Sequence, residues 1–275
     1  MIPTIFALAL QSVTPGVYTP APIELPPRDR AADARAKAVA EFDACIDRAG
    51  ADAADGERAA LDWLSRGGGW AARQCLGFAY GQAGNYAAAA DAFSRAADDA
   101  AKDRADSAAA LWVQAGNAAL AAGAAPRAAR YFDAALAHGS LSGLPLGEAH
   151  LDRARARAAN GDMAGAGEDL ARARIEAAGD PLVWLLSATL ARRQGDLAAA
   201  ASYIAETARL SPTDPATLLE AGNIAILSGQ DETARRNWEA VVAAAPDSAE
   251  AASARENLGR LGAVAADPAP GDQSR

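Results

Sequence analysis

The stretch Pro181–Asp214, PLVWLLSATLARRQGDLAAAASYIAETARLSPTD, is followed directly by Pro215–Ser248, PATLLEAGNIAILSGQDETARRNWEAVVAAAPDS. The preceding block, Gly147–Asp180, continues the same spacing of 34 residues. Small and large residues recur at matching offsets in the three blocks: Gly161, Gly195 and Gly229; Ala166, Ala200 and Ala234; Leu170, Ile204 and Trp238. Such a period is typical of stacked helical units, none of which can bury its apolar face alone. The sequence therefore predicts a solenoid, whose function depends on an extended surface.

The residues between these markers favour helices. The segments are rich in Ala, the strongest helix former, and no alternating run of β-branched residues indicates a strand. The Gly at the fifteenth position of each block ends a first helix where a left-handed residue is needed. Asp180-Pro181 and Asp214-Pro215 start the next unit, because Asp caps free N–H groups and Pro fits the first helical position. The predicted fold class is all-α.

This register resembles the tetratricopeptide repeat (TPR) family. Five units match it, at 70–103, 109–142, 147–180, 181–214 and 215–248. In the first two units the family's preferred positions are held by Gly77, Tyr80, Gly84, Ala89, Phe93 and Ala96, then by Trp112, Gly116, Gly123, Ala128, Phe132 and Ala135. The resemblance implies a right-handed solenoid of stacked helix-turn-helix repeats.

The third unit departs most from the family pattern. His150, Arg153 and Arg157 stand where packing residues are usual, just after a short insertion at 143–146. Two interpretations remain open: a tolerated irregularity, or the place where the scaffold acquired its specificity.

The remaining segments are assigned from composition. Residues 1–29 are expected to be a short signal peptide, with an apolar run Ile2–Leu10, plus a Pro-rich linker. The alternative is a disordered tail whose apolar residues pack loosely. Residues 30–69 read as a degenerate N-terminal helical pair, 249–262 as a capping helix and 263–275 as a disordered tail.

Two cysteines, Cys45 and Cys75, fall in neighbouring predicted helices. Stacked units bring alternate helices side by side, so an exported protein would be expected to form a disulfide here. The alternative is a pair of buried thiols that act as small apolar residues. The preference for Arg over Lys, which occurs only at Lys37 and Lys102, indicates a GC-rich and hence bacterial genome.

Composition and motifs argue against several classes of function. A formal net charge of −9 does not suit a nucleic-acid surface. The apolar run near the N-terminus is too short to span a bilayer, which takes roughly 20 residues. His138 and His150 lack zinc-ligand spacing, and no nucleophile-elbow, zinc-protease or phosphate-loop motif occurs. We therefore expect no enzyme activity, no metal and no cofactor.

The resemblance implies that the first helix of each unit lines a concave groove through positions 2, 5, 9 and 12, which share one helical stripe. Apolar members would seat side chains of a ligand, the two asparagines would hold its backbone, and the two arginines would pair with a carboxylate. Val113 and Asp152 depart from the subfamily that clamps C-terminal carboxylates. The alternative is that the leucines pack against neighbouring helices and the arginines form internal ion pairs. The predicted groove residues are Phe78, Asn117, Leu120, Leu151, Arg155, Leu185, Arg192, Leu219, Asn223 and Ile226.

The sequence thus predicts a non-catalytic scaffold that binds another protein or peptide in its groove. We expect a periplasmic or secreted monomer, with a cytoplasmic location as the alternative. A second hypothesis is a structural module that self-associates, or braces an envelope complex, through its convex or terminal surfaces.

Overall fold

The computed structural model describes residues 30–266, in which helices joined by turns and short loops are the only regular secondary structure, and this confirms the all-α fold class. The expected signal peptide and linker at 1–29, and residues 267–275 of the expected tail, lie outside the described residues. The helices are α1 (Arg30–Ala51), α2 (Ala53–Ser65), α3 (Gly69–Gln82), α4 (Tyr86–Lys102), α5 (Ser107–Ala121), α6 (Ala125–His138), α7 (Gly143–Ala159), α8 (Met163–Glu176), α9 (Pro181–Arg193), α10 (Leu197–Leu210), α11 (Pro215–Leu227), α12 (Asp231–Ala244) and α13 (Ala249–Ala266).

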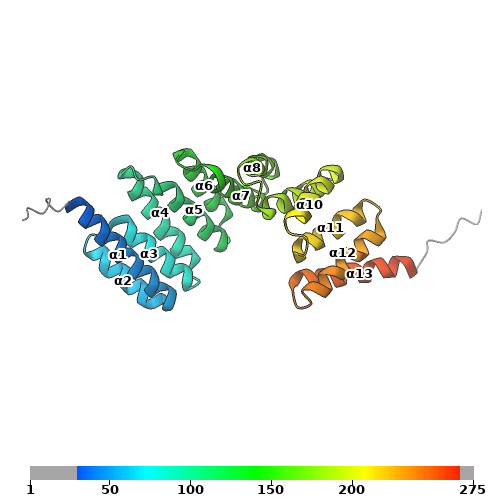
Figure 1. Cartoon of the computed structure of the whole chain (residues 1–275), viewed down its shortest axis with the longest axis horizontal. Helices are drawn as coiled ribbons and strands as arrows, with labels where there is room; N and C mark the ends of the chain where they lie inside the picture. The colour runs from blue at the N-terminus through cyan, green and yellow to red at the C-terminus, as the bar shows by residue number, and fades with distance from the viewer. Residues whose placement is uncertain (1–29, 267–275) are drawn as a thin grey trace, which may run out of the picture.

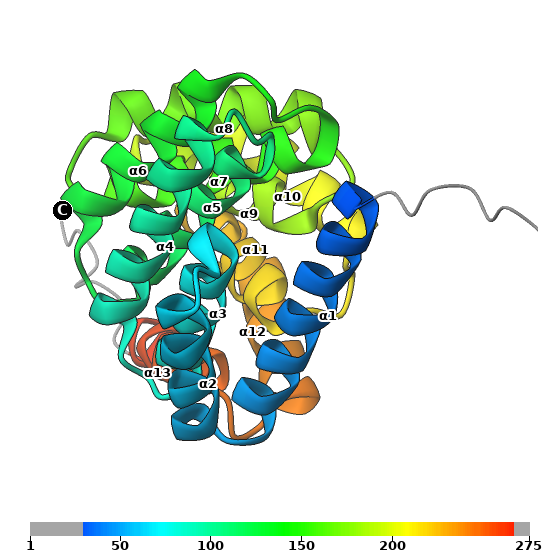
Figure 2. The same cartoon turned by 90° about the vertical axis from the view of Figure 1, so that its left-hand side faces the viewer.

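Successive helices pack against one another and form an arched solenoid (Figure 1). Seen along the arch, the first helices of the repeats, α3, α5, α7, α9 and α11, lie toward the centre, and α4, α6, α8 and α10 lie outside them (Figure 2). The first helices therefore line the concave face. The junctions α8–α9 and α10–α11 are packed less extensively than α4–α5 and α6–α7.

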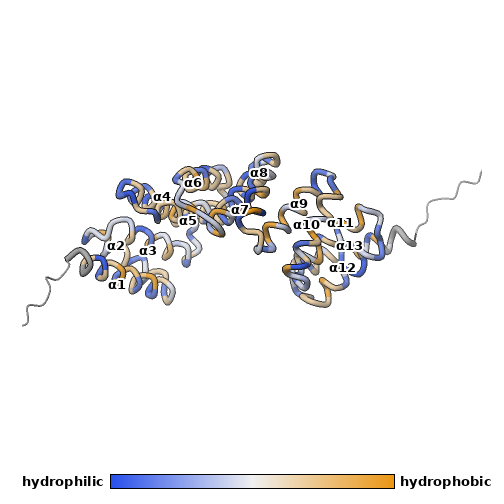
Figure 3. The backbone as a smooth tube through the Cα atoms, turned by 45° about the horizontal axis from the view of Figure 1, so that its top comes forward, coloured by the Kyte–Doolittle hydropathy of each residue, from blue (hydrophilic) through white to orange (hydrophobic). Residues whose placement is uncertain are grey.

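Hydrophilic and hydrophobic residues alternate along the helices, as an amphipathic repeat requires (Figure 3). Within residues 30–266, no helix combines the length and apolarity needed to cross a membrane.

The helix ends have local causes that the sequence reveals. The Gly at position 15 has a positive φ in all five units, between 70° and 83°, at Gly84, Gly123, Gly161, Gly195 and Gly229. Asp180 and Asp214 cap α9 and α11 by accepting hydrogen bonds from the N–H groups of Leu182 and Thr217, at 2.9 and 2.8 Å. Further side-chain caps begin the outer helices α4, α8 and α10, at Asn85, Asp162 and Asp196.

The core consists mostly of alanines, with one large side chain at position 24 of each unit. Phe132 of α6 is fully buried and packs directly over Gly116 of α5. A Cβ atom added at Gly116 would lie 2.6 Å from the Phe132 ring, which is closer than van der Waals contact allows. The glycine at position 8 therefore sets the distance between the two helices of this unit.

We expect Gly116→Ala to destabilise the protein by about 1–2 kcal/mol, because the overpacking cost exceeds the gain in helix propensity. Gly81→Ala is the matched control, since Gly81 also lies in a first helix but has no neighbouring atom within 4 Å of an added Cβ. This control should raise stability by up to about 1 kcal/mol. Urea unfolding followed by circular dichroism measures both, and equal effects at the two sites would contradict the packing argument.

Cys45 of α1 and Cys75 of α3 are joined by a disulfide, with their Cα atoms 6.2 Å apart. Both residues are buried in a cluster that includes Trp63 and Leu76. The bridge fastens the N-terminal helical pair to the first repeat.

Cys45→Ala/Cys75→Ala is expected to cost about 2–4 kcal/mol, because the bridge closes a loop of sequence separation 30 in the unfolded chain. The loss should concentrate in α1–α3, since a solenoid is stabilised by neighbouring units. Hydrogen exchange of the variant measures this locally. Faster exchange spread evenly over α1–α13 would contradict the expected localisation.

Candidate functional site

Three pockets that include first-helix residues lie between elements of neighbouring units. We call them the α5–α7 pocket, the α7–α9 pocket and the C-terminal pocket. Their volumes are about 420, 230 and 580 Å³. Each contains at least one of the predicted groove residues.

The α5–α7 pocket brings together Asn117 and Leu151, at positions 9 and 5 of successive units. Asn117 is exposed, whereas Leu151 is 4% exposed and belongs to the core as well as to the pocket floor. Glu148 and Asp152 place two carboxylates at this pocket. The other lining residues are Ala110, Val113, Leu141 and Pro145.

The α7–α9 pocket contains one predicted groove residue, Arg155. Its walls are apolar, and a second arginine, Arg193, also lines it. The other lining residues are Ala154, Ala158, Met163, Ala166, Leu170, Leu186, Thr189 and Leu190.

The C-terminal pocket unites Arg192, Asn223 and Ile226 with residues of α13. The Asn223 Oδ1 atom accepts hydrogen bonds from Trp238 Nε1 at 3.3 Å and from Asn257 Nδ2 at 3.1 Å. Its Nδ2 group makes no hydrogen bond within the described residues. The remaining lining residues are Leu227, Asp231, Trp238, Asn257, Arg260 and Leu261.

Arg192 is already engaged inside the protein. Its Nε atom donates to Glu220 Oε1 at 2.6 Å, and the Glu220 side chain is buried. This ion pair joins α9 to α11, so Arg192 contributes to stacking as well as to the pocket wall.

The other four predicted groove residues line none of the three pockets and pack against core clusters. Phe78 and Leu120 pack against the cluster that contains Phe93 and Phe132. Leu185 and Leu219 pack against clusters farther along the chain, around Ile204 and Trp238 respectively.

Several lining residues were missed by the sequence argument. Leu227 and Arg193 occupy position 13, directly after the stripe of positions 2, 5, 9 and 12. Asn257 lies one full period after Asn223, so α13 repeats the position-9 asparagine of a first helix. Extending the period past Ser248 would have revealed it.

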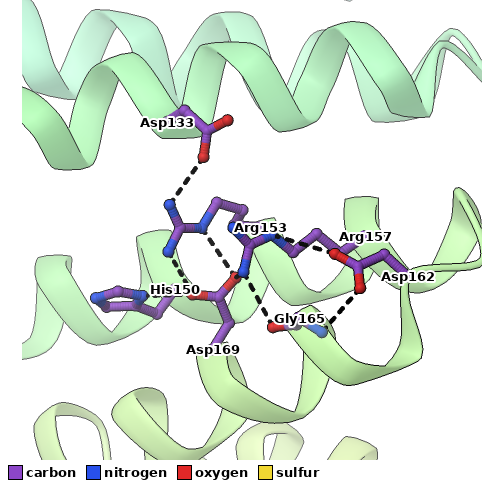
Figure 4. Close-up of polar contacts among 7 residues, drawn as sticks. All are labelled: Asp133, His150, Arg153, Arg157, Asp162, Gly165 and Asp169. Carbon is purple, nitrogen blue, oxygen red and sulfur yellow. Dashed lines mark hydrogen bonds and ion pairs between the residues drawn. The ribbon is translucent and has the colours of Figure 1, made fainter.

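The departures in the third unit form a buried polar network (Figure 4). Asp169 of α8 is 1% exposed and accepts a hydrogen bond from His150 Nδ1 at 2.8 Å. Arg153 donates to both carboxylate oxygens, at 2.9 and 2.6 Å, and Arg157 Nη1 lies 3.0 Å from Oδ2. The third guanidinium nitrogen of Arg153, Nη1, donates to the exposed carboxylate of Asp133 on α6, at 2.8 Å.

The network connects three helices and satisfies its own members. Arg157 also donates to the Gly165 carbonyl at 3.1 Å, and Asp162 caps the same turn through the Gly165 N–H group. No buried side-chain nitrogen or oxygen in the described part of the chain lacks a hydrogen-bond partner. Polar residues thus replace apolar packing inside this unit, which supports the interpretation of a structural irregularity.

Burial alone raises the pKa of Asp169, but hydrogen bonds from His150 and Arg153 and the charges of Arg153 and Arg157 hold that pKa below its ordinary value. The folded state therefore binds a proton at Asp169 less readily than the unfolded state. Its contribution to stability is complete above the unfolded pKa of about 3.9 and is lost as the pH falls through the folded pKa.

We therefore expect the difference in unfolding free energy between the wild type and Asp169→Ala to narrow below about pH 4. Urea unfolding at several pH values from 7 to 3 measures this difference. A difference that grows on acidification would contradict the assigned charge state.

Within residues 30–266, no three His, Cys, Asp or Glu side chains are grouped so that they could hold a metal ion. The sequence matches no protein-family model and no curated protein.

The fold is similar to several solved structures. PilW, a widely conserved type IV pilus biogenesis factor, aligns with a TM-score of 0.66 at 20% identity, over 80% of this chain and 98% of PilW. PilF of Pseudomonas aeruginosa aligns with a TM-score of 0.60 at 15% identity, over 82% of this chain and 99% of PilF. YrrB, a TPR protein with an unusual peptide-binding site, aligns with a TM-score of 0.53 at 18% identity, over 67% of this chain and 91% of YrrB.

Proposed function

The chain has the fold of TPR solenoids, and we propose that it is a non-catalytic scaffold that binds a peptide or protein segment along its concave face. The observation that carries the proposal is the set of three pockets that contain residues of the predicted first-helix stripe. The structural likeness to YrrB, whose described feature is a peptide-binding site, supports the same reading.

The pockets fit an extended ligand better than a compact one. They lie between elements of successive units, from α5 at one end to α13 at the other, so only an extended ligand could reach all three. Apolar walls would take side chains, and the amide groups of Asn117 and Asn223 would hydrogen-bond a ligand backbone. Leu227, which is 56% exposed, offers apolar surface at the C-terminal pocket.

Asn117→Arg/Leu227→Glu tests the proposal, since both side chains line the groove and both are exposed. Ile175→Glu is the control, because Ile175 is 77% exposed on the outer helix α8. In affinity capture from cells of the source organism, a protein that the wild type recovers should be lost with the groove variant and retained with the control. Equal recovery with both variants would contradict groove binding. Thermal unfolding checks that both variants are folded.

We also propose that the protein acts in the bacterial envelope, in the periplasm or outside the cell. The Cys45–Cys75 bridge suits an oxidising compartment. Two proteins with similar folds are PilW, a type IV pilus biogenesis factor, and PilF of the bacterium Pseudomonas aeruginosa. Mass spectrometry of the native protein should show loss of about the first 10 to 20 residues, near the small-x-small sequence Ala7-Leu8-Ala9 that signal peptidase could cleave. Thiol titration under denaturing conditions should find no free thiol. An intact N-terminus together with two reactive thiols would favour the cytoplasmic alternative.

Self-association is the second candidate function, and exposed apolar side chains outside the pockets favour it. Val39, Leu61 and Ile175 are 53%, 46% and 77% exposed. Light scattering over a range of concentrations separates the two functions. We expect a constant monomer mass, whereas a mass that rises with concentration and falls back in Ile175→Glu would support self-association.

A further inference from the structure

The α7–α9 pocket has room because small residues line it. Ala158 occupies position 12 of its unit, where α5 and α11 carry Leu120 and Ile226. Ala154 and Ala166 form further parts of the wall. The pocket volume is about 230 Å³, and a cavity of about 150 Å³ already holds benzene. One branched aliphatic or aromatic side chain would therefore fit.

The apolar surface of this pocket is only partly covered. Leu186, Leu190 and Met163 are half-buried, whereas Leu170 at the base is buried. A ligand side chain that covers them would remove apolar surface from water, which is favourable by about 25 cal/mol per Å².

The charged groups at the pocket all have one sign. Arg155 and Arg193 are exposed, and no carboxylate lines the pocket. Arg155 pairs with Asp152, which lies on its own helix at 2.9 Å. Arg193 forms no ion pair with any residue in the described chain. A guanidinium group in this position favours a carboxylate, to which it can donate two hydrogen bonds.

The neighbouring pockets do not offer the same environment. Glu148 and Asp152 bring negative charge to the α5–α7 pocket, and Asp231 lies in the C-terminal pocket beside Arg192 and Arg260. Both of those arginines already have internal carboxylate partners, Glu220 and Glu256. Along the concave face, uncompensated positive charge is therefore concentrated at Arg193.

We propose that the α7–α9 pocket binds a peptide segment in which one large apolar side chain stands next to a carboxylate. The apolar side chain enters between Leu186 and Leu190, and the carboxylate meets Arg193, with Arg155 as the second cation. This inference rests on the proposed function and names the chemistry of its ligand.

Display of random twelve-residue peptides against the whole protein tests the inference without a known partner. We expect the selected peptides to share Asp or Glu within two positions of Leu, Ile, Phe or Met. One selected peptide is then synthesised with fluorescein, and its affinity is measured by fluorescence anisotropy. A second version replaces its acidic residue with the corresponding amide.

Arg193→Gln should lower the affinity for the acidic peptide about tenfold, as expected for the loss of a partly exposed charge-assisted hydrogen bond. The amide version should bind the wild type and Arg193→Gln equally. Arg172→Gln is the matched control, because Arg172 is an exposed arginine on the outer helix α8, outside the pocket, and its removal changes the net charge equally. This control should leave the affinity within about twofold.

Two results would overturn the inference while leaving groove binding intact. The first is the selection of peptides that lack a carboxylate. The second is an acidic peptide whose affinity does not change with Arg193→Gln but whose binding is abolished by Asn117→Arg/Leu227→Glu. Selected peptides that are insensitive to all of these groove variants would contradict the proposed function and the inference together.

Discussion

Asp169→Ala is expected to lower the free energy of unfolding by about 3–5 kcal/mol, the cost of breaking a buried ion pair by removing one partner. The carboxylate is 1% exposed and is the common acceptor for His150, Arg153 and Arg157. Without it, two guanidinium groups remain near each other in the interior with fewer acceptors. Their repulsion and desolvation both act against folding.

Asp133→Ala is the matched control, because it removes another carboxylate from the same Arg153 side chain. Asp133 is exposed, its side chain 54% so, and water can replace it, so we expect a loss below about 1 kcal/mol. Urea unfolding at pH 7 measures both variants. Similar losses from Asp133→Ala and Asp169→Ala would mean that burial does not decide the value of this network.

Phe132→Ala is expected to cost about 3–5 kcal/mol, which is typical of deleting a buried aromatic side chain from a core. Phe132 is 0% exposed and belongs to a cluster that reaches from Ala89 and Phe93 of α4 to Ala156 of α7. The surrounding side chains are mainly alanines, which cannot move into the space that the ring leaves. The cavity should therefore persist and the cost should lie near the upper end of this range.

The position of Phe132 adds a second expectation. A solenoid is stabilised by intrinsic repeat terms and nearest-neighbour interfaces, so a defect in one central unit weakens its coupling to both sides. We expect the unfolding transition of Phe132→Ala to broaden or to separate into two steps, as followed by calorimetry. Ile175→Ala, which removes a 77% exposed side chain, should leave the transition unchanged. A single sharp transition in Phe132→Ala, with only its midpoint temperature lowered, would contradict the expected separation into two unfolding steps.

The fold was predictable from the sequence because its signals are local and repeated. A glycine at position 15 reports a left-handed helix end wherever it occurs, and Asp-Pro reports a helix start. Five copies in register reinforce one another, so even the unit with His150 and Arg157 could be placed. The same period would have assigned Asn257 a position in a first helix, had it been extended into α13.

The candidate site was predictable only in outline. The resemblance to TPR repeats predicted a first-helix stripe of groove residues, and six of these residues line pockets: Asn117, Leu151, Arg155, Arg192, Asn223 and Ile226. The position of a residue in the repeat did not indicate which side chains already form contacts within the protein. Arg192 pairs with Glu220 from the next unit, whereas its neighbour Arg193 has no ionic partner in the described residues.

The sequence by itself determined the helices and their order, because these depend on residues close together along the chain. Only the tertiary structure decided what the polar residues of the third unit do and where the groove has room. Asp169 accepts hydrogen bonds from His150 and Arg153, which lie 19 and 16 residues away in the sequence. The volume of a pocket depends on how closely neighbouring units pack. Such distances are set by the summed packing of many side chains, which a repeat pattern does not specify.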